Sequence, residues 1–459
     1  MSKLCKFTHY IIYMDKKSIK DKVLKPILNA GFQAYFVGGC VRDALLGKQI
    51  NDFDIATNAT PENLQKIFTW FILKESVAHG VTIPIIDNEP VEIATFRKES
   101  TYSDGRHPDG VVFTDSMKED ALRRDFTINA LYEDINGKIF DPTNQGLKDL
   151  KNQVLRFIGN TEERINEDRL RALRYCRFIA QLDFVPKDFF HVERDFFDDI
   201  SYERIGAELK KLFGSDKPVK GVLAAIKTGV FNTFAIDLLD IIDKMSNEGQ
   251  RPDFHFGDVL KHTFAVMENL RQFDHDWRDM MAAFFHDVGK PIVGKINGPR
   301  RVGETFNNHA QHEIYSTKFF ESWVKQRPGM MCNSDINIIK SMILNHTAVG
   351  NLCERKDAFK IYKVVSSPVF DRTVKLEIAD QMAHVCVKHK IDEILDRPQI
   401  KEIIARVGEP RKVTGKDLID AGLKPDSLFG KRLEAAFKAQ IKHLEFDKQK
   451  LLEVALSVK

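Results

Sequence analysis

The alternation of apolar and polar positions divides the chain into a mixed first part and a helical remainder. Apolar residues recur at helical spacing across 17–32, whereas 34–37 is a short apolar run that favours a strand. Two further strand-like runs cover 80–87 and 90–96. From about residue 160 the helical period continues almost to the end. The pattern therefore predicts an α+β head followed by an all-α remainder.

The stretch 34–62 predicts a strand, a glycine turn, a short helix and a second strand in immediate succession. Gly38 and Gly39 interrupt the first strand. In the second strand Asp52 and Asp54 alternate with apolar residues. Successive side chains of a strand point to opposite faces, so we expect both carboxylates on one face, about 7 Å apart.

These residue types suit chemistry on a phosphate. Two carboxylates on one face repel each other without a cation, and hard oxygen ligands favour Mg²⁺. A glycine turn before a helix lets backbone N–H groups approach a phosphate, and Arg42 adds a positive charge there. Taken singly, a Gly-Gly pair is usually a turn and an Asp-x-Asp pair is often a solvated strand end. Together they form the minimal equipment for two-metal phosphoryl or nucleotidyl transfer.

Composition narrows the class of protein further. The 459 residues suffice for roughly two to four domains, and the net charge of +3 means that nucleic-acid affinity would need local basic patches. The six cysteines are scattered without a Cys-x-x-Cys pair, which argues against thiolate zinc sites and disulfides and favours a reducing cytoplasm. No apolar run reaches transmembrane length, so no membrane association is expected. The first 13 residues lack an adequate signal-peptide core, and Met14 is a second candidate start.

A polar loop and a charged helix follow the strands of the head. Residues 95–113 are polar and contain glycine and proline, which is typical of a mobile loop. Ser116 can cap a helix, with a glutamate three residues later to complete a capping box. Arg124 and Asp125 lie near the end of that helix, and 126–132 returns to strand-like spacing. Without further information, surface ion pairs are the simplest interpretation of these charges.

The segment after residue 160 begins with a Thr161 cap and places five arginines between apolar positions. On one continuous helix, charged residues would share one side and its flanks: Glu167, Asp168, Arg171, Arg174 and Arg177. One interpretation is a surface Glu–Arg pair, worth only a few tenths of a kcal/mol. The other is base recognition, because cytosine and adenine both present an amine beside an unprotonated ring nitrogen. An aspartate that accepts from the amine and an arginine that donates to the nitrogen would select C and A and reject U and G.

A second group of candidate ligands lies in the helical remainder: His262, His286, Asp287, His309, His312, His346 and Asp380. Imidazole and carboxylate ligands without cysteine suit a divalent ion such as Mn²⁺, Fe²⁺, Ni²⁺ or Mg²⁺ better than a structural zinc. A single histidine near an apolar face is more often a core residue, so the hypothesis depends on the whole series. The spacing leaves open whether His309 or His312 occupies the middle position.

Several of these motifs resemble one known family. The stretch 34–62 resembles motif A of the DNA-polymerase-β-like nucleotidyltransferases, and its continuation DIATNATPE resembles the bacterial class II tRNA nucleotidyltransferases and poly(A) polymerases. RRDFTINAL and the Glu-Asp-x-x-Arg run at 167–171 match the same family, and the histidine series resembles the HD phosphohydrolase domain that some members carry. The basic tail, with Gly415 and a turn at 422–425, also resembles theirs, although a solvated lysine face is an equal alternative.

The resemblance implies a polymerase-β-like head, a helical neck and body, an HD domain and a tRNA-binding tail. These domains would occupy 17–150, 151–250, 251–395 and 396–459. The catalytic carboxylates would be two Mg²⁺ ligands and a third acid that positions or activates the attacking hydroxyl: Asp52, Asp54 and Glu92. The triphosphate and ribose would be held by Gly38, Gly39, Arg42, Arg124 and Asp125. The base would pair with Asp168 and Arg171, supported by Arg174 and Arg177.

For the HD site, the resemblance implies a divalent transition metal or Mg²⁺ bound by His262, His286, Asp287 and Asp380. His312 and His346 would bind phosphate or a second metal. The implied reaction is addition of CCA to the 3′ end of tRNA from CTP and ATP. Two alternatives remain open: a poly(A) polymerase or an enzyme that adds only CC or only A, and a phosphohydrolase whose HD site performs the main reaction.

Overall fold

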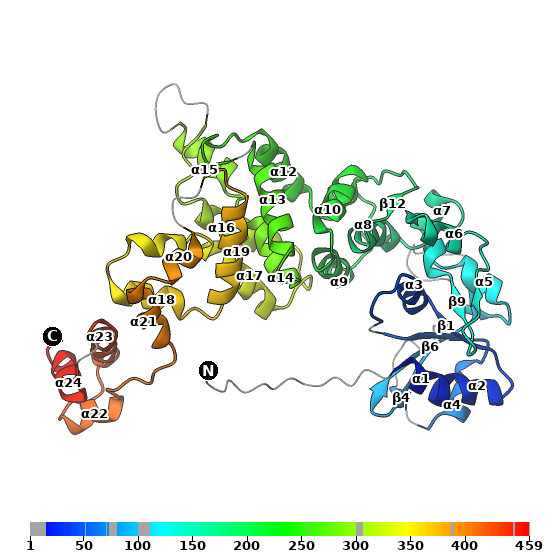
Figure 1. The fold of residues 1–459 in the computed structure, drawn as a ribbon, viewed down its shortest axis with the longest axis horizontal. Helices are drawn as coiled ribbons and strands as arrows, with labels where there is room; N and C mark the ends of the chain where they lie inside the picture. The colour runs from blue at the N-terminus through cyan, green and yellow to red at the C-terminus, as the bar shows by residue number, and fades with distance from the viewer. Residues whose placement is uncertain are drawn as a thin grey trace. The chain divides into compact units, whose positions relative to one another are not determined.

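The structure is a computed structural model that describes residues 15–50, 52–69, 71–72, 80–99, 111–255, 257–299, 306–386, 390–443 and 446–458. The chain divides into two units, which Figure 1 shows as a ribbon. Unit 1 comprises Met1–Glu208 and Lys220–Phe234, and unit 2 comprises Leu209–Val219 and Ala235–Lys459. The finer division into four domains stays a prediction. Met14 and most of the loop predicted at 95–113 lie outside the described residues.

Unit 1 contains a mixed sheet whose strands run in the order β10-β9-β1-β2-β6-β4-β3, with β5 paired to β4. Its strands are β1 (Ala34–Val37), β2 (Asp54–Thr57), β3 (Phe71–Ile72), β4 (Val81–Ile86), β5 (Glu89–Pro90), β6 (Glu92–Thr95), β9 (Tyr132–Glu133) and β10 (Ile139–Phe140). β1 is antiparallel to β2 and to β9, whereas β2 and β6 are parallel. Two smaller pairs are β7 (Arg97–Glu99) with β8 (Val111–Phe113), and β11 (Val154–Leu155) with β12 (Val185–Pro186).

Helices of unit 1 pack on this sheet, and further helices follow it along the chain. They are α1 (Lys16–Ile19), the π-helical turn η1 (Lys20–Leu24), α2 (Lys25–Asn29), α3 (Gly39–Leu45), α4 (Pro61–Ile67), α5 (Met117–Leu122), the 3-10 turn η3 (Thr127–Asn129), α6 (Gly146–Lys151), α7 (Thr161–Glu167), α8 (Leu170–Leu182) and α11 (Val230–Phe234). The residues of α9 (Tyr202–Phe213) and α10 (Pro218–Lys227) are divided between the two units. α3 packs against β1, and α4 packs against β4 and α2 (Figure 1). The apolar residues of the strands form the core between them, as their alternation predicts.

The strand predicted over 126–132 is wrong over most of its length. Residues Thr127–Asn129 form the 3-10 turn η3, and only Tyr132–Glu133 joins the sheet. The Thr127 hydroxyl donates to Asp149 at 2.7 Å, and the Asn129 amide donates to Asp125 at 3.1 Å. These side-chain hydrogen bonds compete with a strand ladder.

The predicted capping box at Ser116 forms only in part. Ser116 Oγ accepts from the backbone N–H of Glu119 at 3.3 Å, as predicted. The Glu119 carboxylate instead accepts a hydrogen bond from the Thr114 hydroxyl. α5 therefore begins where the sequence predicts, with a different partner for its first acid.

The continuous helix predicted after residue 160 is interrupted. Asn160, and not Thr161, caps α7 by accepting from the Glu163 N–H at 3.1 Å. α7 ends at Glu167, because Asp168 adopts an extended backbone with φ −136° and ψ 100°. Asp168 Oδ1 then accepts from the N–H of Leu170, the first residue of α8, at 3.2 Å. The predicted acidic reader of the base thus lies at a break between two helices.

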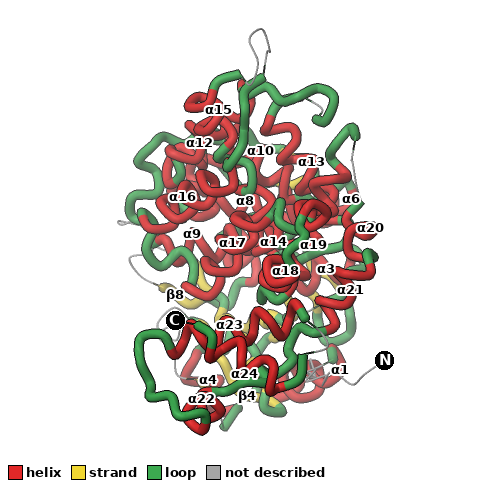
Figure 2. Tube along the Cα trace, turned by 90° about the vertical axis from the view of Figure 1, so that its left-hand side faces the viewer, coloured by secondary structure: helices red, strands yellow, loops and turns green. Residues whose placement is uncertain are grey.

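The described residues of unit 2 form helices joined by loops, with a few isolated β-bridges, and Figure 2 shows these helices in red. They are α12 (Ile236–Asn247), α13 (Val259–Arg271), α14 (Trp277–Phe285), α15 (Lys290–Asn297), α16 (His312–Lys325), α17 (Asn333–Asn345), the 3-10 turn η4 (Gly350–Glu354), α18 (Ala358–Val365), α19 (Phe370–Met382), α20 (Ile391–Leu395), α21 (Pro398–Ala405), α22 (Gly415–Asp420), α23 (Phe429–Lys442) and α24 (Lys448–Leu456). α13 packs on α14 and α19, and α17 packs on α14 and α16. Separate apolar clusters lie at 349–403 and at 413–455.

Candidate functional site

Three carboxylates gather at the start of the parallel strands β2 and β6. Asp54 opens β2 and pairs in register with Glu92, which opens β6. Adjacent strands are about 4.8 Å apart, so in-register side chains on one face are neighbours. Asp52 precedes the strand and is close enough to Asp54 to act on its ionisation. The structure therefore brings together the three acids that the sequence singles out, although Asp52 lies just outside the strand.

The charges around Asp54 fit a cation site. Desolvation raises the pKa of Asp54, Arg124 lowers it, and the carboxylates of Glu92 and Asp52 raise it. A divalent cation would relieve the repulsion between these acids. The donors are all hard oxygen atoms, which suits Mg²⁺. The residues present thus fit the ion that the resemblance implies.

The glycine turn after β1 borders this group of acids. Gly38 has φ +76° and ψ −130°, a conformation that side chains rarely adopt. A Cβ atom at Gly38 would lie 3.6 Å from Asp54 Oδ2 and 3.6 Å from Arg124 Nη1. At Gly39 a Cβ atom would lie 3.7 Å from Arg42 Nη2. The glycines therefore leave open space between an acid and two guanidinium groups.

Arg124 is anchored by a buried acid. Its Nη2 atom donates to Asp120 at 3.1 Å, and its Nε atom donates to the Tyr132 hydroxyl at 3.2 Å. Burial opposes the ionisation of Asp120, but Arg124 and Arg123 outweigh it and lower the pKa of Asp120 to about 2. The ionised Asp120 holds the Arg124 guanidinium in place beside Gly38.

Two hydrogen bonds and one ion pair connect Arg42 with α8. Arg42 Nη1 donates to Asn129 at 2.7 Å, and Asn129 in turn donates to Asp125 at 3.1 Å. Asp125 pairs with Arg174 of α8 at 2.6 Å, and Arg174 lowers the pKa of Asp125 against the effect of burial. Three of the predicted nucleotide-binding residues, Arg42, Asp125 and Arg174, are thus joined in one network through Asn129, which was not predicted.

The other predicted residues of α8 have different partners. Arg177 pairs with Glu208 at 2.6 Å, and its guanidinium lies 4.0 Å from the centroid of the Phe178 ring. Arg171 is buried and donates to Glu167 at 2.7 Å and to the Arg123 carbonyl at 2.9 Å. These contacts orient both arginines from within unit 1.

Asp168 has its own partners at the break between α7 and α8. Asp168 lies 3.5 Å from Arg204 of α9 and accepts from the Leu170 N–H. Base pairing by both residues would therefore require Arg171 to exchange at least one of its present partners for the base. Their proposed roles stay predictions.

The second site gathers the four predicted HD metal ligands from three helices of unit 2 or their ends. His262 lies in α13, His286 and Asp287 follow α14, and Asp380 lies in α19. His262 Nε2 lies 2.8 Å from Asp380 Oδ1, and His286 Nε2 lies 3.2 Å from Asp287 Oδ2. His262, His286 and Asp287 are almost fully buried.

The structure also distinguishes the two candidates for the middle histidine. His312 Nε2 lies 3.1 Å from Asp287 Oδ1 and 3.0 Å from His346 Nε2, so His312 and His346 both belong to the group. His309 instead bonds Glu248 at 2.8 Å. These contacts favour His312 over His309 for the middle position, and its role as a ligand stays a prediction.

The buried atoms of this second group fit a metal. Among the described residues, His286 Nε2 and both carboxylate oxygens of Asp287 make no well-aligned hydrogen bond. Burial opposes the ionisation of Asp287, but His286 and Lys290 outweigh it and hold the pKa of Asp287 well below its usual range. Burial also lowers the pKa of His346 to about 3, which keeps its imidazole neutral. A neutral imidazole and an ionised carboxylate side by side are ligands for a divalent transition metal.

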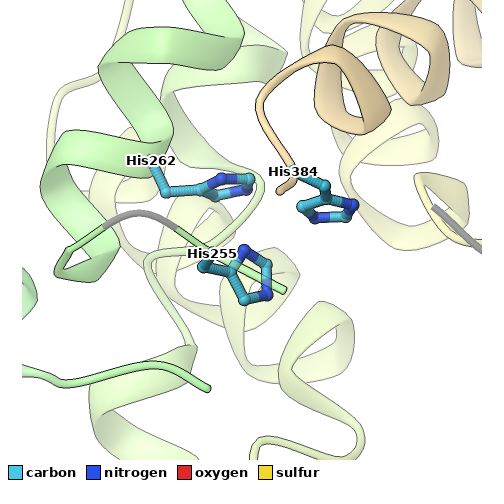
Figure 3. A group of neighbouring side chains, drawn as sticks. All are labelled: His255, His262 and His384. Atoms are coloured by element: carbon cyan, nitrogen blue, oxygen red, sulfur yellow. The ribbon is translucent and has the colours of Figure 1, made fainter. Parts of the chain in front are cut away.

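Sequence reasoning missed three residues at this site. Lys290, one turn after Asp287, lies 2.7 Å from Asp287 Oδ2. His255 and His384 lie against His262, as Figure 3 shows. All three line a cavity of about 540 Å³ together with Asp287 and Asp380. No motif marks His255 or His384, because only tertiary pairing brings them to the site.

Comparisons with known proteins agree with this geometry. The model of the "Poly A polymerase head domain" family matches residues 34–156, which contain the three acids, the glycine turn and Arg124. This defines the first part of the chain as a head domain of a nucleotidyltransferase. A CCA-adding enzyme of Ligilactobacillus salivarius is 46% identical over 213 residues, which cover 46% of this chain and 52% of that protein. A CCA-adding enzyme of Leuconostoc mesenteroides is 38% identical over 289 residues, which cover 61% of this chain and 71% of that protein.

The chain belongs to the CCA-adding enzyme family. The match nevertheless spans only about half the length of the first of these relatives. A solved structure of the Bacillus stearothermophilus CCA-adding enzyme in complex with CTP shares the fold, with a TM-score of 0.66 and 22% identity over 96% of this chain and 98% of that one. The Thermotoga maritima enzyme complexed with tRNA has a TM-score of 0.56 and 18% identity over 97% and 96%. The predicted fold is confirmed, and in the described part of the chain no helix has the length and apolar character to cross a bilayer.

Proposed function

We propose that this protein adds CCA to the 3′ end of tRNA from CTP and ATP without a nucleic-acid template. One observation carries the proposal: Glu92 lies beside Asp54, and Gly38 lies next to both Asp54 and Arg124, so that the four residues form one site in the head. Relatives named as CCA-adding enzymes match this part of the chain, and solved relatives of the same fold bind CTP and tRNA.

Each group at this site has a distinct task in nucleotidyl transfer. Mg²⁺ held by Asp52 and Asp54 would lower the pKa of the attacking hydroxyl and neutralise the departing pyrophosphate. Glu92, beside Asp54, would orient the RNA 3′-hydroxyl toward the α-phosphate. Arg124 would bind the triphosphate near the glycine turn, where the missing Cβ atom lets phosphate oxygens approach.

The network through Asn129 would connect phosphate binding with recognition of the nucleoside. Arg42 and Arg174 lie at its two ends, and Asp125 between them would accept hydrogen bonds from the ribose hydroxyls. Asp168 and Arg171 would read the base edge by accepting from the amine and donating to the ring nitrogen. This reading requires Arg171 to turn away from one of its carbonyl partners when the nucleotide binds.

A groove in unit 2 supports tRNA as the partner. It lies between α18 and α23 and has a volume of about 530 Å³. Its lining contains four lysines and three aromatic rings: Phe359, Lys360, Lys363, Lys438, Lys442, His443 and Phe446. Lysine ammonium groups bind phosphates, and aromatic rings offer surfaces for stacking. The net charge of the protein is small, so such a local basic groove is what RNA binding requires.

The HD site supports a second candidate activity, hydrolysis of phosphate esters. His286, Asp287 and their neighbours would hold a divalent metal, and the adjoining cavity of about 540 Å³ has room for a phosphorylated ligand. Terminal phosphates and cyclic phosphates of RNA are the substrates that we propose. The ion would supply Lewis-acid activation of the phosphoryl group.

Two substitutions separate these activities. Asp54→Ala should abolish nucleotide incorporation, since it removes a ligand of the nucleotidyl-transfer metal, and should leave phosphohydrolysis intact. Asp287→Ala should have the opposite effect. Incorporation is measured on tRNA with Mg²⁺, and hydrolysis on a 2′,3′-cyclic nucleotide with Mn²⁺, Ni²⁺ or Mg²⁺. Each variant serves as the control for the other, and loss of both activities from either change would contradict the two-site account.

A further inference from the structure

Three histidine rings meet beside the HD residues. His255 precedes α13, His262 lies near the start of α13, and His384 follows α19. Figure 3 shows the rings turned toward a shared space, although the three segments are far apart in the sequence. His255 and His384 belong to no motif used above.

The geometry of the rings is that of a ligand set. The centroid of the His255 ring lies 4.7 Å from that of the His262 ring and 4.5 Å from that of the His384 ring. The His262 and His384 rings are nearly parallel at 10°, with centroids 5.3 Å apart, and His255 is nearly perpendicular to both. One nitrogen of each ring lies within 4.8 Å of the others, a spacing at which three atoms can share one ion.

The backbone holds two of these histidines in place independently of their side chains. His255 and His384 face each other in an antiparallel bridge, and the Val385 N–H donates to the Phe254 carbonyl at 2.8 Å. A site fixed in this way needs little rearrangement to bind an ion, because its ligands are already close.

Two of the ring nitrogens lack a hydrogen bond. His255 Nδ1 and His262 Nδ1 are buried and have no hydrogen-bond partner among the described residues. Buried polar atoms are normally paired, so unpaired ones require an explanation such as a bound ion. The other nitrogen of His262 lies 2.8 Å from Asp380, so His262 has one nitrogen on the HD group and one still unused.

We propose that His255, His262 and His384 form a second transition-metal position beside the HD site. Three imidazoles suit Zn²⁺, Ni²⁺, Fe²⁺ or Cu²⁺ and disfavour Mg²⁺. His255 and His384 line the same cavity as Asp287, so both ions would face one phosphorylated ligand. The proposal rests on the proposed HD site only through the shared residue His262, whose ring would bridge the two ions as an imidazolate and would release its N–H proton to solvent when the second ion binds.

Counting metal ions tests this proposal directly. The full-length protein would carry Asp54→Ala, which removes the head cation, and would be stripped with a chelator, reloaded with Ni²⁺ or Zn²⁺ and desalted. Mass spectrometry of the metal should find two ions per chain. His255→Ala and His384→Ala should each reduce this to one, whereas His309→Ala, in the same cavity but bonded to Glu248, should retain two. Far-UV circular dichroism of the metal-free variants checks that each is folded.

Adding Asp287→Ala distinguishes this inference from the HD proposal. The Asp287→Ala protein should retain one ion, and X-ray absorption should find imidazole ligands around it. Adding His384→Ala should remove that ion as well. If the parent binds one ion and only Asp287→Ala removes it, the inference is overturned and the proposed HD metal site is supported. If the parent binds one ion and only His384→Ala removes it, the inference is upheld and the proposed HD metal is overturned. If the parent binds no ion, both proposals are overturned.

Discussion

Replacing Gly38 by alanine tests whether the space beside this glycine is needed to bind the triphosphate. The change puts a methyl group on a residue with φ +76° and ψ −130°, which strains the backbone by about 1–3 kcal/mol. The added Cβ atom would lie 3.6 Å from both Asp54 Oδ2 and Arg124 Nη1, an ordinary contact that the ligand-free protein tolerates. A triphosphate would need that same space. We therefore expect nucleotide incorporation to fall by more than tenfold in kcat/KM, a loss of more than about 1.4 kcal/mol in transition-state stabilisation.

Gly31→Ala is the matched control. Gly31 has φ +87° and a Cβ atom there would meet nothing within 4 Å, so this change strains the backbone without filling the site. Only Gly38→Ala should lose incorporation, measured with Mg²⁺, CTP and tRNA at a temperature where urea denaturation shows both variants to be folded. Equal incorporation by the two variants would refute the argument that the missing Cβ atom makes room for phosphates.

Two further predictions concern stability and RNA binding. The pKa of Asp120 falls from 3.8 to about 2 on folding, which contributes about 2 kcal/mol of stability that is fully present above pH 3.8 and is lost as the pH falls toward 2. The stability difference between the native protein and Asp120→Asn should therefore shrink over that range of pH in urea denaturation, and a difference independent of pH would contradict it. Lys442→Ala removes one ammonium group from the basic groove and should lower the slope of log Kd against log salt for tRNA by about 1 in filter binding. Lys401→Ala, whose ammonium pairs with Asp396 at 2.9 Å outside that groove, should leave the slope unchanged.

Local sequence patterns were sufficient to predict those parts of the head that are formed by residues adjacent in the sequence. Residues 34–37 are apolar and end at two glycines, which predicts the strand, turn and helix that the structure contains. The apolar-acid-apolar pattern around Glu92 predicts a strand. That this strand lies parallel to β2, with Glu92 beside Asp54, depends on pairing between distant segments. The sequence alone could suggest that placement only through resemblance to a family.

The parts that sequence reasoning missed have physical causes. Helical periodicity runs through Asp168, but the aspartate side chain bonds the Leu170 N–H and ends α7. His255 and His384 lie in irregular segments without periodicity, and a backbone bridge between them creates their proximity. Spacing could not separate His309 from His312 either, because their side chains are distinguished by contacts with Glu248 and Asp287.

The most direct test of the account is nucleotide incorporation by the purified protein with Mg²⁺. Two substrates are needed, a tRNA that ends at the discriminator base and a tRNA that ends in CC, each with the four nucleoside triphosphates singly and together. We expect addition of two C and then one A to the first substrate, one A to the second, and no U or G to either. A long A tail without C would contradict it in favour of a poly(A) polymerase, and a lack of any incorporation would shift the main activity to the HD site.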